Sequence, residues 1–558
     1  MPGPAVDRLA PVRHVLARAC AAIGVLAPVR RARARWALRR DPLIRERAEA
    51  DAGRYATFAS ATAHLWRADP GPRAARRALV LSTRTPGVEA ELGTLKAVQA
   101  AGFDVTVLLE DEHRSLAPFY RLGGATAVHL WSRFMPSGAY AGRARMLMRE
   151  ASSLDDAMAL TADGIRVGRI SACTALRDLR VGALDLAHAG GRATMVRRLA
   201  ASLAAVEQAA AILDATAPDL VVTEPEYTPK GELFELALAR GLDVVCYAEA
   251  HRRDTLMFKR YHAGNRDDHV TTLSPSTWTD LRQAPWTPAR RARVADEIAR
   301  GYRDGDWFNP RPAPAGPAPA DAARALDLDP SKKTAAVFPH VLWDAPVMWG
   351  TPLFPSYQEW LLRTMQVAYE NTALNWVVKL HPSHVWRRAD EGYTETEERR
   401  VIERRLGPPP PHVRFIPPET SLTTDGLLRC VDYCLTVRGT VGVEAARLGI
   451  PVLTAGRARY THHGFTVDSA SAGEYLDRLR QLESRPALDE ATRELADRFA
   501  YGAFVLRPWR MQSVTVGRDG RPGIAVTSAA GWDAAPDIRA LAAWLASADE
   551  DFLAPDAA

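Results

Sequence analysis

Short, almost wholly apolar segments alternate with longer helical patterns along most of the chain, and this alternation constrains the fold more than any other feature. In the first half, the apolar segments cover residues 77–82, 103–109, 219–223 and 243–247. The helical patterns between them cover residues 89–100, 206–215 and 231–240. Buried strands that alternate with helices indicate βαβ units and a parallel sheet covered on both faces. The first half is therefore predicted to be an α/β domain.

The second half repeats the alternation. Its apolar segments cover residues 334–338, 376–380, 413–416, 432–437 and 451–455. Its helical patterns cover residues 357–370, 393–406, 423–429 and 440–448, and Ser471 with Glu474 forms a capping box for one more helix. Five strands with intervening helices predict a second doubly wound sheet.

A proline-rich stretch separates the two halves. It reads Asn-Pro-Arg-Pro-Ala-Pro-Ala-Gly-Pro-Ala-Pro from Asn309, a sequence that continues neither a helix nor a central strand. The 558 residues also exceed what one hydrophobic core usually holds. The predicted organisation is a basic helical extension (1–70), a first Rossmann-like domain (71–308), a linker (309–325), a second Rossmann-like domain (326–500) and a tail that packs back on the first half (501–558).

The composition is that of a folded globular protein, with 47% hydrophobic and 25% charged residues. A net charge of +6 permits an anionic ligand, but no basic face with interleaved aromatics indicates nucleic acid. The five cysteines are scattered, which favours a reducing compartment over a disulfide framework. Cys430 and Cys434 have no matching Cys/His pair after them, so they are predicted to be core residues and not zinc ligands.

The N-terminal extension contains an apolar stretch at residues 14–29 that includes Arg18 and is too short to span a bilayer. Six arginines follow it between Arg30 and Arg40, on the wrong side for a signal peptide. Two interpretations fit this pattern: a basic amphipathic helix on the inner face of the membrane, or a solvated helical extension. No transmembrane segment is predicted elsewhere in the chain either, and the expected location is the cytoplasm.

Lys379 and His381-Pro382 stand at the end of the strand predicted at 376–380. The carboxyl ends of parallel strands form the edge where open α/β sheets bind ligands. A lysine or histidine there can neutralise or hydrogen-bond a nucleotide phosphate, although a structural turn would use the same residues.

A second motif, Arg438-Gly439-Thr440, joins the strand at 432–437 to the next helix. Gly439 is predicted to let a phosphate approach backbone N–H groups at the helix start. Glu444 lies one position too late to cap that helix with Thr440, so it is a candidate for binding a ribose or sugar hydroxyl. The alternative is an ordinary strand-to-helix turn with a surface glutamate.

Candidate catalytic side chains follow two strands of the first half. Glu224 and Glu226 come directly after the strand at 219–223, and His251 follows the strand at 243–247. Glu226 or Glu224 is a candidate general base or stabiliser of a cationic transition state, with a helix-start carboxylate as the alternative. His251 is a candidate for the same site, with anion binding favoured over proton transfer.

The loop at 457–464 follows the last core strand and is rich in hydrogen-bond donors, among them Tyr460. The adjacent His462 and His463 suit opposite directions better than joint metal ligation. No Asp-x-Asp motif indicates a metal-bridged pyrophosphate. No metal and no cofactor are therefore predicted.

Residues 378–382 (Val-Lys-Leu-His-Pro), residues 436–453 and the Gly456-x3-Tyr460-x3-Gly464 pattern together resemble bacterial capsule and surface-polysaccharide biosynthesis proteins, in particular the Kdo-transferase type of glycosyltransferase. The resemblance covers residues 334–470 well and the first half loosely. It implies a GT-B-like arrangement in which the second domain binds a nucleotide sugar and the first faces the acceptor. It also implies that His381, Pro382, Gly439 and Thr440 hold the phosphate of a CMP-activated sugar. Arg438-Gly439-Thr440 stands where members often carry a serine.

The expected function is transfer of a sugar from a nucleotide donor to a capsular or other surface polysaccharide or glycolipid. Three alternatives remain open: a polyol-phosphate transferase of the teichoic-acid type, a nucleotide-sugar 2-epimerase, and a membrane-docked assembly subunit without activity.

Overall fold

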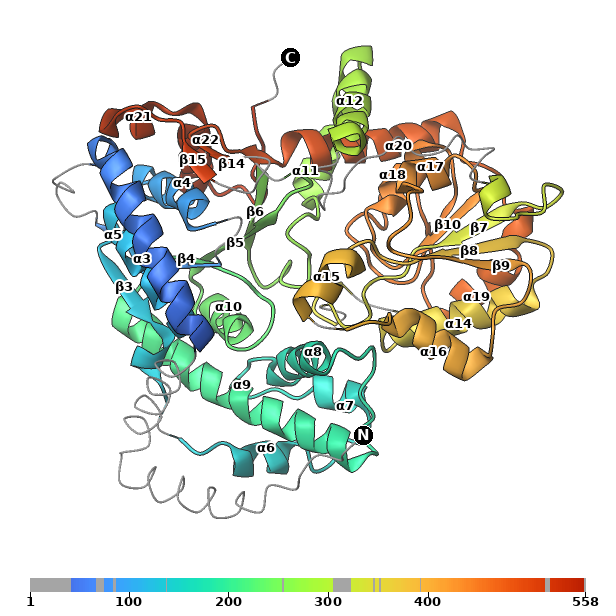
Figure 1. The fold of residues 1–558 in the computed structure, drawn as a ribbon, viewed down its shortest axis with the longest axis horizontal. Helices are drawn as coiled ribbons and strands as arrows, with labels where there is room; N and C mark the ends of the chain where they lie inside the picture. Colours follow the sequence, from blue (N-terminus) through green and yellow to red (C-terminus); the bar gives the residue numbers. More distant parts are fainter. Residues whose placement is uncertain are drawn as a thin grey trace.

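The computed structural model describes residues 42–66, 75–83, 87–136, 138–252, 255–304, 323–344, 347–350, 353–391, 393–516 and 522–555. Most of the predicted N-terminal extension and most of the proline-rich linker lie outside these residues. The described part contains two large sheets, each flanked by helices on both faces (Figure 1).

The first sheet has the strand order β13-β6-β5-β4-β1-β2-β3. Its strands are β1 (Arg76–Leu81), β2 (Phe103–Leu109), β3 (Ala127–Leu130), β4 (Leu220–Thr223), β5 (Asp243–Glu249), β6 (Thr255–Tyr261) and β13 (Trp509–Arg510). The first five are parallel, and their order, 3-2-1-4-5, is that of a Rossmann fold. The strands β6 and β13 extend the sheet in antiparallel fashion. The order reverses between β1 and β4, so a ligand site is expected beyond the carboxyl ends of these two strands.

The second sheet has the order β12-β11-β10-β7-β8-β9 and is parallel throughout. Its strands are β7 (Thr334–Val337), β8 (Asn375–Lys379), β9 (Val413–Ile416), β10 (Tyr433–Thr436), β11 (Val452–Thr454) and β12 (Val467–Asp468). Numbered within the domain, this is again the order 3-2-1-4-5-6, with the reversal between β7 and β10. The prediction of an α/β fold with two Rossmann-like domains in a GT-B-like arrangement is confirmed.

The helices of the first half surround its sheet. They are α3 (Pro42–Thr62), α4 (Val88–Ala100), α5 (Ala117–Leu122), α6 (Ala141–Leu147), α7 (Leu154–Met158), α8 (Val167–Leu179), α9 (Ala189–Thr216) and α10 (Lys230–Ala239). The helix predicted at 206–215 is the second half of the 28-residue α9. By length and composition α9 alone among the described helices could cross a membrane, but its buried side chains pack against α8 and α10. The described end of the N-terminal extension, α3, packs Tyr55 against Phe119 of α5.

Two layers of helices cover the second sheet (Figure 1). One layer contains α14 (Tyr357–Glu370), α16 (Glu397–Leu406) and α19 (Ala472–Arg480), and the other contains α17 (Thr424–Leu428), α18 (Val441–Arg447) and α20 (Glu490–Ala500). The helix predicted at 393–406 is α16 with a preceding turn, and a separate helix, α15 (His384–Glu391), follows β8.

Two helices that precede the linker pack on the second domain. They are α11 (Pro275–Gln283) and α12 (Pro288–Asp304), which lie inside the range 71–308 predicted for the first domain. Their apolar residues Leu281, Val294 and Ile298 join the core that contains α18 and α20. Both helices lie beside α20 in Figure 1. The second domain is therefore covered in part by residues from the first half of the chain.

The C-terminal segment returns to the first domain. After a π-helical turn at Tyr501–Leu506, β13 pairs with β6, and α22 (Pro536–Ala546) packs on α4. A short hairpin of β14 (Val514–Val516) and β15 (Pro522–Ile524) and the helix α21 (Ala529–Ala534) precede α22.

Candidate functional site

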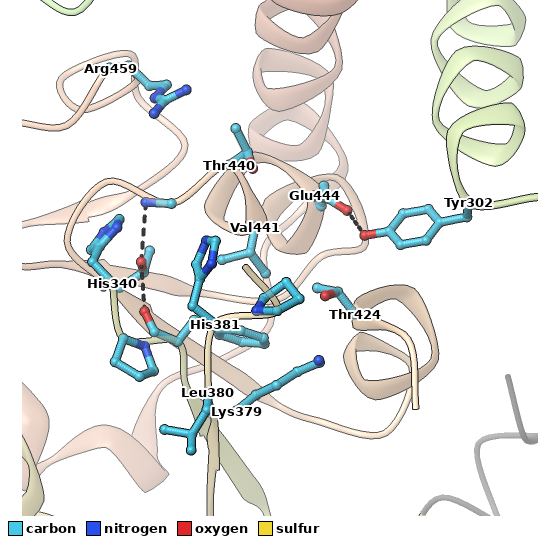
Figure 2. A pocket seen from close by; sticks show the side chains of 15 residues that line it. Tyr302, His340, Lys379, Leu380, His381, Thr424, Thr440, Val441, Glu444 and Arg459 are labelled. Carbon is cyan, nitrogen blue, oxygen red and sulfur yellow. Dashed lines mark hydrogen bonds between the residues drawn. The ribbon is translucent and has the colours of Figure 1, made fainter. Parts of the chain in front are cut away.

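A pocket of about 280 Å³ opens where the strand order of the second sheet reverses. Residues that follow the carboxyl ends of β7, β8 and β10 form its floor, and α18 forms one wall (Figure 2). The lining residues that the sequence predicted are Lys379, His381, Pro382, Gly439, Thr440 and Glu444. The structure thus brings together six of the eight predicted donor-site residues.

The loop of residues 438–440 is held by three side chains from different elements. The N–H of Arg438 donates to His340 Nε2 (3.0 Å), and the N–H of Gly439 donates to Thr436 Oγ1 (3.3 Å). The hydroxyl of Tyr460, a residue that does not line the pocket, donates to the carbonyl of Gly439 (2.7 Å). The loop is therefore fixed before any ligand arrives.

This arrangement changes the predicted roles of two residues. Tyr460 is fully buried and supports the loop, so it does not line the pocket. The N–H of Gly439 donates to Thr436 at the end of β10, so it is not among the helix-start N–H groups that could face a phosphate. Gly439 instead provides room, because a Cβ there would lie 3.0 Å from Thr436 Oγ1.

The side chains around the pocket carry positive charge. Lys379 and Arg459 line it, and Arg438 lies close enough to Arg459 for the two charges to interact. Burial and the Arg438 charge lower the pKa of Arg459 to about 10, so Arg459 stays charged at neutral pH. No carboxylate lies within ion-pair distance of Arg459 among the described residues. Such a group is best stabilised by an anionic ligand.

Two histidines of the pocket have assignable hydrogen-bond roles. His381 Nδ1 accepts from the N–H of Ser383 (3.2 Å), which assigns the proton of a neutral His381 to Nε2. The ring lines the pocket beside Val441 (Figure 2). Burial, with the charges of Arg438, His381 and Arg459, holds the pKa of His340 well below its usual range. His340 therefore stays neutral and able to accept the N–H of Arg438.

Glu224 and Glu226 lie in the first domain, directly after β4 and so at the point where the order of the first sheet reverses. Lys230 Nζ donates to Glu224 (2.8 Å), and the indole N–H of Trp349 donates to Glu226 Oε1 (3.2 Å). Burial and the nearby charges of Asp344 and Glu224 raise the pKa of Glu226 to about 7. A carboxyl group with this pKa can accept or release a proton near neutral pH.

One segment of the second domain lies between the pocket and Glu226. It begins with Phe338, Pro339 and His340 at the pocket, and its described residues 341–344 and 347–350 include two that contact the first domain. There Asp344 accepts from Arg177 of α8 (3.0 Å), and Trp349 contacts Glu226. Residues of one segment therefore both line the pocket and contact the candidate carboxylate Glu226 in the first domain.

His251 does not reach the pocket. Its side chain is 1% exposed, and Nε2 lies 2.8 Å from Glu297 Oε1 on α12. A histidine with this burial and an ion-pair partner holds two elements together, so the structure does not support the predicted catalytic position of His251.

The sequence analysis did not single out the other lining residues with polar side chains, which are His340, Tyr302, Thr424, Thr436 and Arg459. His340 follows a predicted strand end as His381 does, so the same criterion identifies it. Arg459 stands in the donor-rich loop at 457–464, although only Tyr460 was singled out there. Nothing in the local sequence marks Tyr302, since it reaches the pocket from a helix in the first half.

One cluster of the described residues has the spacing of a metal site. Glu110, Glu112 and His113 follow β2, with ligand atoms within 4.8 Å of one another. The ammonium group of Lys230 lies 3.6 Å from Glu110 and already supplies a positive charge there. The cluster lies outside the pocket.

Comparisons with known proteins cover both the sequence and the fold. Residues 319–494 match the model of a family described as capsule polysaccharide biosynthesis protein. A search of curated protein sequences gave no match. Among solved structures, the chain is similar to the KpsC beta Kdo 2,4 transferase of Thermosulfurimonas dismutans, with 16% identity, a TM-score of 0.33, and coverage of 58% of this chain and 87% of that one.

A second similar structure is the UDP-GlcNAc 2-epimerase of Neisseria meningitidis bound to UDP-GlcNAc, with 15% identity, a TM-score of 0.27, and coverage of 77% and 96% of the two chains. The calicheamicin glycosyltransferase CalG4 gives 16% identity, a TM-score of 0.27, and coverage of 77% and 95%. The family match carries more weight than these distant likenesses, and it includes nearly all of the pocket. Residues 319–494 thus match the same family that the resemblance in the sequence indicated.

Proposed function

We propose that the protein is a glycosyltransferase that moves a sugar from a nucleotide-activated donor to a capsular or other surface polysaccharide or glycolipid. The observation that carries this proposal is the pocket at the reversal point of the second sheet. It combines Lys379, His381 and Arg459 with a preformed loop, within a domain of the capsule polysaccharide biosynthesis family. A nucleotide-linked phosphate is the anion that such a position and such donors suit best.

In the proposed reaction, a hydroxyl oxygen of the acceptor attacks the anomeric carbon of the donor sugar, and the bond from that carbon to the phosphate oxygen breaks. The proton of the hydroxyl passes to Glu226, which must be deprotonated beforehand. Lys379, His381 and Arg459 stabilise the negative charge that develops on the leaving phosphate. Lys379 and Arg459 supply positive charge of the kind that a divalent metal supplies in other nucleotide sites.

The resemblance makes a CMP-linked sugar the first donor to test. Donors of this kind are soluble cytoplasmic metabolites, so the proposal places the reaction on the cytoplasmic side of the membrane. The proposed contact between the N-terminal extension and the inner leaflet falls mostly on residues outside the described part of the chain.

The test is incubation of the full chain with CMP-, UDP- and CDP-linked donors, labelled in the sugar, and a panel of glycolipid acceptors. We expect label on the acceptor and release of an equal amount of free nucleotide. His381→Ala should abolish most of this transfer, whereas His262→Ala should not, because the His262 side chain is 61% exposed in the first domain.

Three other outcomes would each contradict the proposal. Isomerisation of the donor without an acceptor would indicate an epimerase, and transfer of a polyol phosphate from a CDP-linked donor would indicate the teichoic-acid type of enzyme. Binding to lipid vesicles with no turnover of any donor would indicate an assembly subunit.

A further inference from the structure

A segment of the first domain, residues 262–274 between β6 and α11, meets the second domain beside the pocket. Asp268 forms an ion pair with Arg457 of the donor-rich loop at 457–464 (2.9 Å). The ring of the next residue, His269, packs edge-on against Trp349, with 5.1 Å between the ring centroids. Two consecutive residues of the first domain are thus fixed against the second domain.

The contacts of His269 connect the pocket with the candidate base. His269 lies close enough to Arg459, which lines the pocket, to feel its charge. The ring also packs on Trp349, whose indole N–H donates to Glu226 (3.2 Å). His269 does not line the pocket itself. A donor whose phosphate is bound in the pocket and whose sugar reaches Glu226 therefore passes close to His269.

The hydrogen bonds of His269 leave one ring nitrogen for a ligand. Nδ1 accepts from the N–H of Thr271 (3.2 Å), which assigns the proton of a neutral ring to Nε2. Among the residues that the structure describes, no acceptor lies within hydrogen-bonding distance of Nε2. The side chains of His269, Arg459 and Glu226 are all half-buried, so each remains partly accessible.

The charges around His269 define what it can do. Burial, with the charges of Arg459, Arg438 and Arg507, holds the pKa of His269 well below its usual range. The ring therefore stays neutral at physiological pH and does not act as an acid. A neutral imidazole N–H among cations is best matched by an oxygen that accepts a hydrogen bond.

We propose that His269 is a specificity-determining residue for the donor: its Nε2–H donates a hydrogen bond to an oxygen of the transferred sugar. This inference rests on the proposed nucleotide-sugar-dependent function. It divides the donor site between the two domains, because the second domain binds the nucleotide and the first domain contacts the sugar through His269.

The experiment separates the sugar from the nucleotide. Its probes are the labelled nucleotide sugar that the transfer assay accepts and the corresponding free nucleotide, which is CMP for a CMP-linked donor. His269→Phe keeps a ring against Trp349 and removes the N–H. It should raise the KM for the nucleotide sugar about five- to tenfold, as for loss of one hydrogen bond, and leave the calorimetric affinity for the free nucleotide unchanged. His269→Gln retains an N–H donor, so its KM should lie closer to that of the wild type.

His262→Phe is the matched control. His262 belongs to the same segment, and its Nδ1 accepts the N–H of Gly264 two residues later (3.0 Å), just as His269 Nδ1 accepts that of Thr271. Its side chain is 61% exposed, and it does not line the pocket. The control should leave both the KM and the affinity unchanged. Thermal unfolding of the three variants verifies that each is folded.

The outcomes separate the two proposals. If the wild type transfers no sugar from any nucleotide donor, the proposed function fails and this inference falls with it. If transfer occurs but His269→Phe has the KM of His262→Phe, the role of His269 is refuted while the proposed function stands. Equal losses for the free nucleotide and the nucleotide sugar would also refute the sugar contact, as would equal KM values for His269→Gln and His269→Phe.

Discussion

The hydroxyl of Tyr460 allows a quantitative test of how the loop at residues 438–440 is held. Tyr460→Phe removes the 2.7 Å hydrogen bond to the carbonyl of Gly439 and keeps the buried ring. That carbonyl also accepts the N–H of Gly442 at 3.0 Å, so it is not left without a donor. The loss is therefore one net hydrogen bond, about 1 kcal/mol, and not the larger cost of an orphaned buried acceptor.

If this bond is needed in the bound state, the same 1 kcal/mol corresponds to an approximately fivefold loss of nucleotide affinity. Calorimetric titration with CMP and chemical denaturation of each variant measure the two effects. Tyr475→Phe is the control, because its buried hydroxyl interacts with Trp360 (3.0 Å) and Thr364 (3.1 Å) away from the pocket. It should lower stability and leave affinity unchanged. Equal affinities for Tyr460→Phe and wild type would refute the reasoning.

Three further outcomes are expected. The rate of transfer should rise with pH through an apparent pKa near 7 if Glu226 is the proton acceptor, and Trp349→Phe should move this limb to higher pH because the indole N–H favours the ionised form. A pH-independent rate between 5 and 9 would contradict this. Because the pKa of Glu226 is raised from 4.5 to about 7 in the folded protein, the wild type should lose up to about 3 kcal/mol of unfolding free energy as pH rises through that window. Glu226→Gln should not show this loss in denaturation curves at pH 5 and 8. Asp551→Ala should destabilise the protein by about 3–5 kcal/mol, because Lys259 and Arg507, both fully buried, lose their shared carboxylate; a loss below 1 kcal/mol would contradict this.

Nine strands of the two large sheets could be predicted, because each is a short apolar run at a strand-to-helix boundary, whereas β3, β6, β12 and β13 were not predicted. The observed β8 (Asn375–Lys379) and β10 (Tyr433–Thr436) lie within one residue of the predicted segments. The strand β6 was missed because Lys259 and Arg260 interrupt its apolar pattern. The buried Lys259 pairs with Glu550 and with Asp551, which is 292 residues away, and no local pattern records these partners.

The pocket was predictable wherever a functional residue follows a strand. Lys379 is the last residue of β8 and His381 follows that strand, and His340 follows β7 in the same way. The other site residues could not be predicted, because their positions depend on partners that are distant in the sequence. His251 looked like a site residue because it follows β5, and only its contact with Glu297, 46 residues away, shows that it is buried in an ion pair.

Nucleotide binding to the pocket tests the central claim most directly. The measurement is calorimetric titration of CMP, UDP and CDP into the wild type and into His381→Ala. We expect at least one nucleotide to bind the wild type at a single site, and His381→Ala to weaken it about ten- to a hundredfold, as for loss of a hydrogen bond to a charged group. Absence of binding by all three nucleotides, or binding that His381→Ala leaves unchanged, would contradict the account.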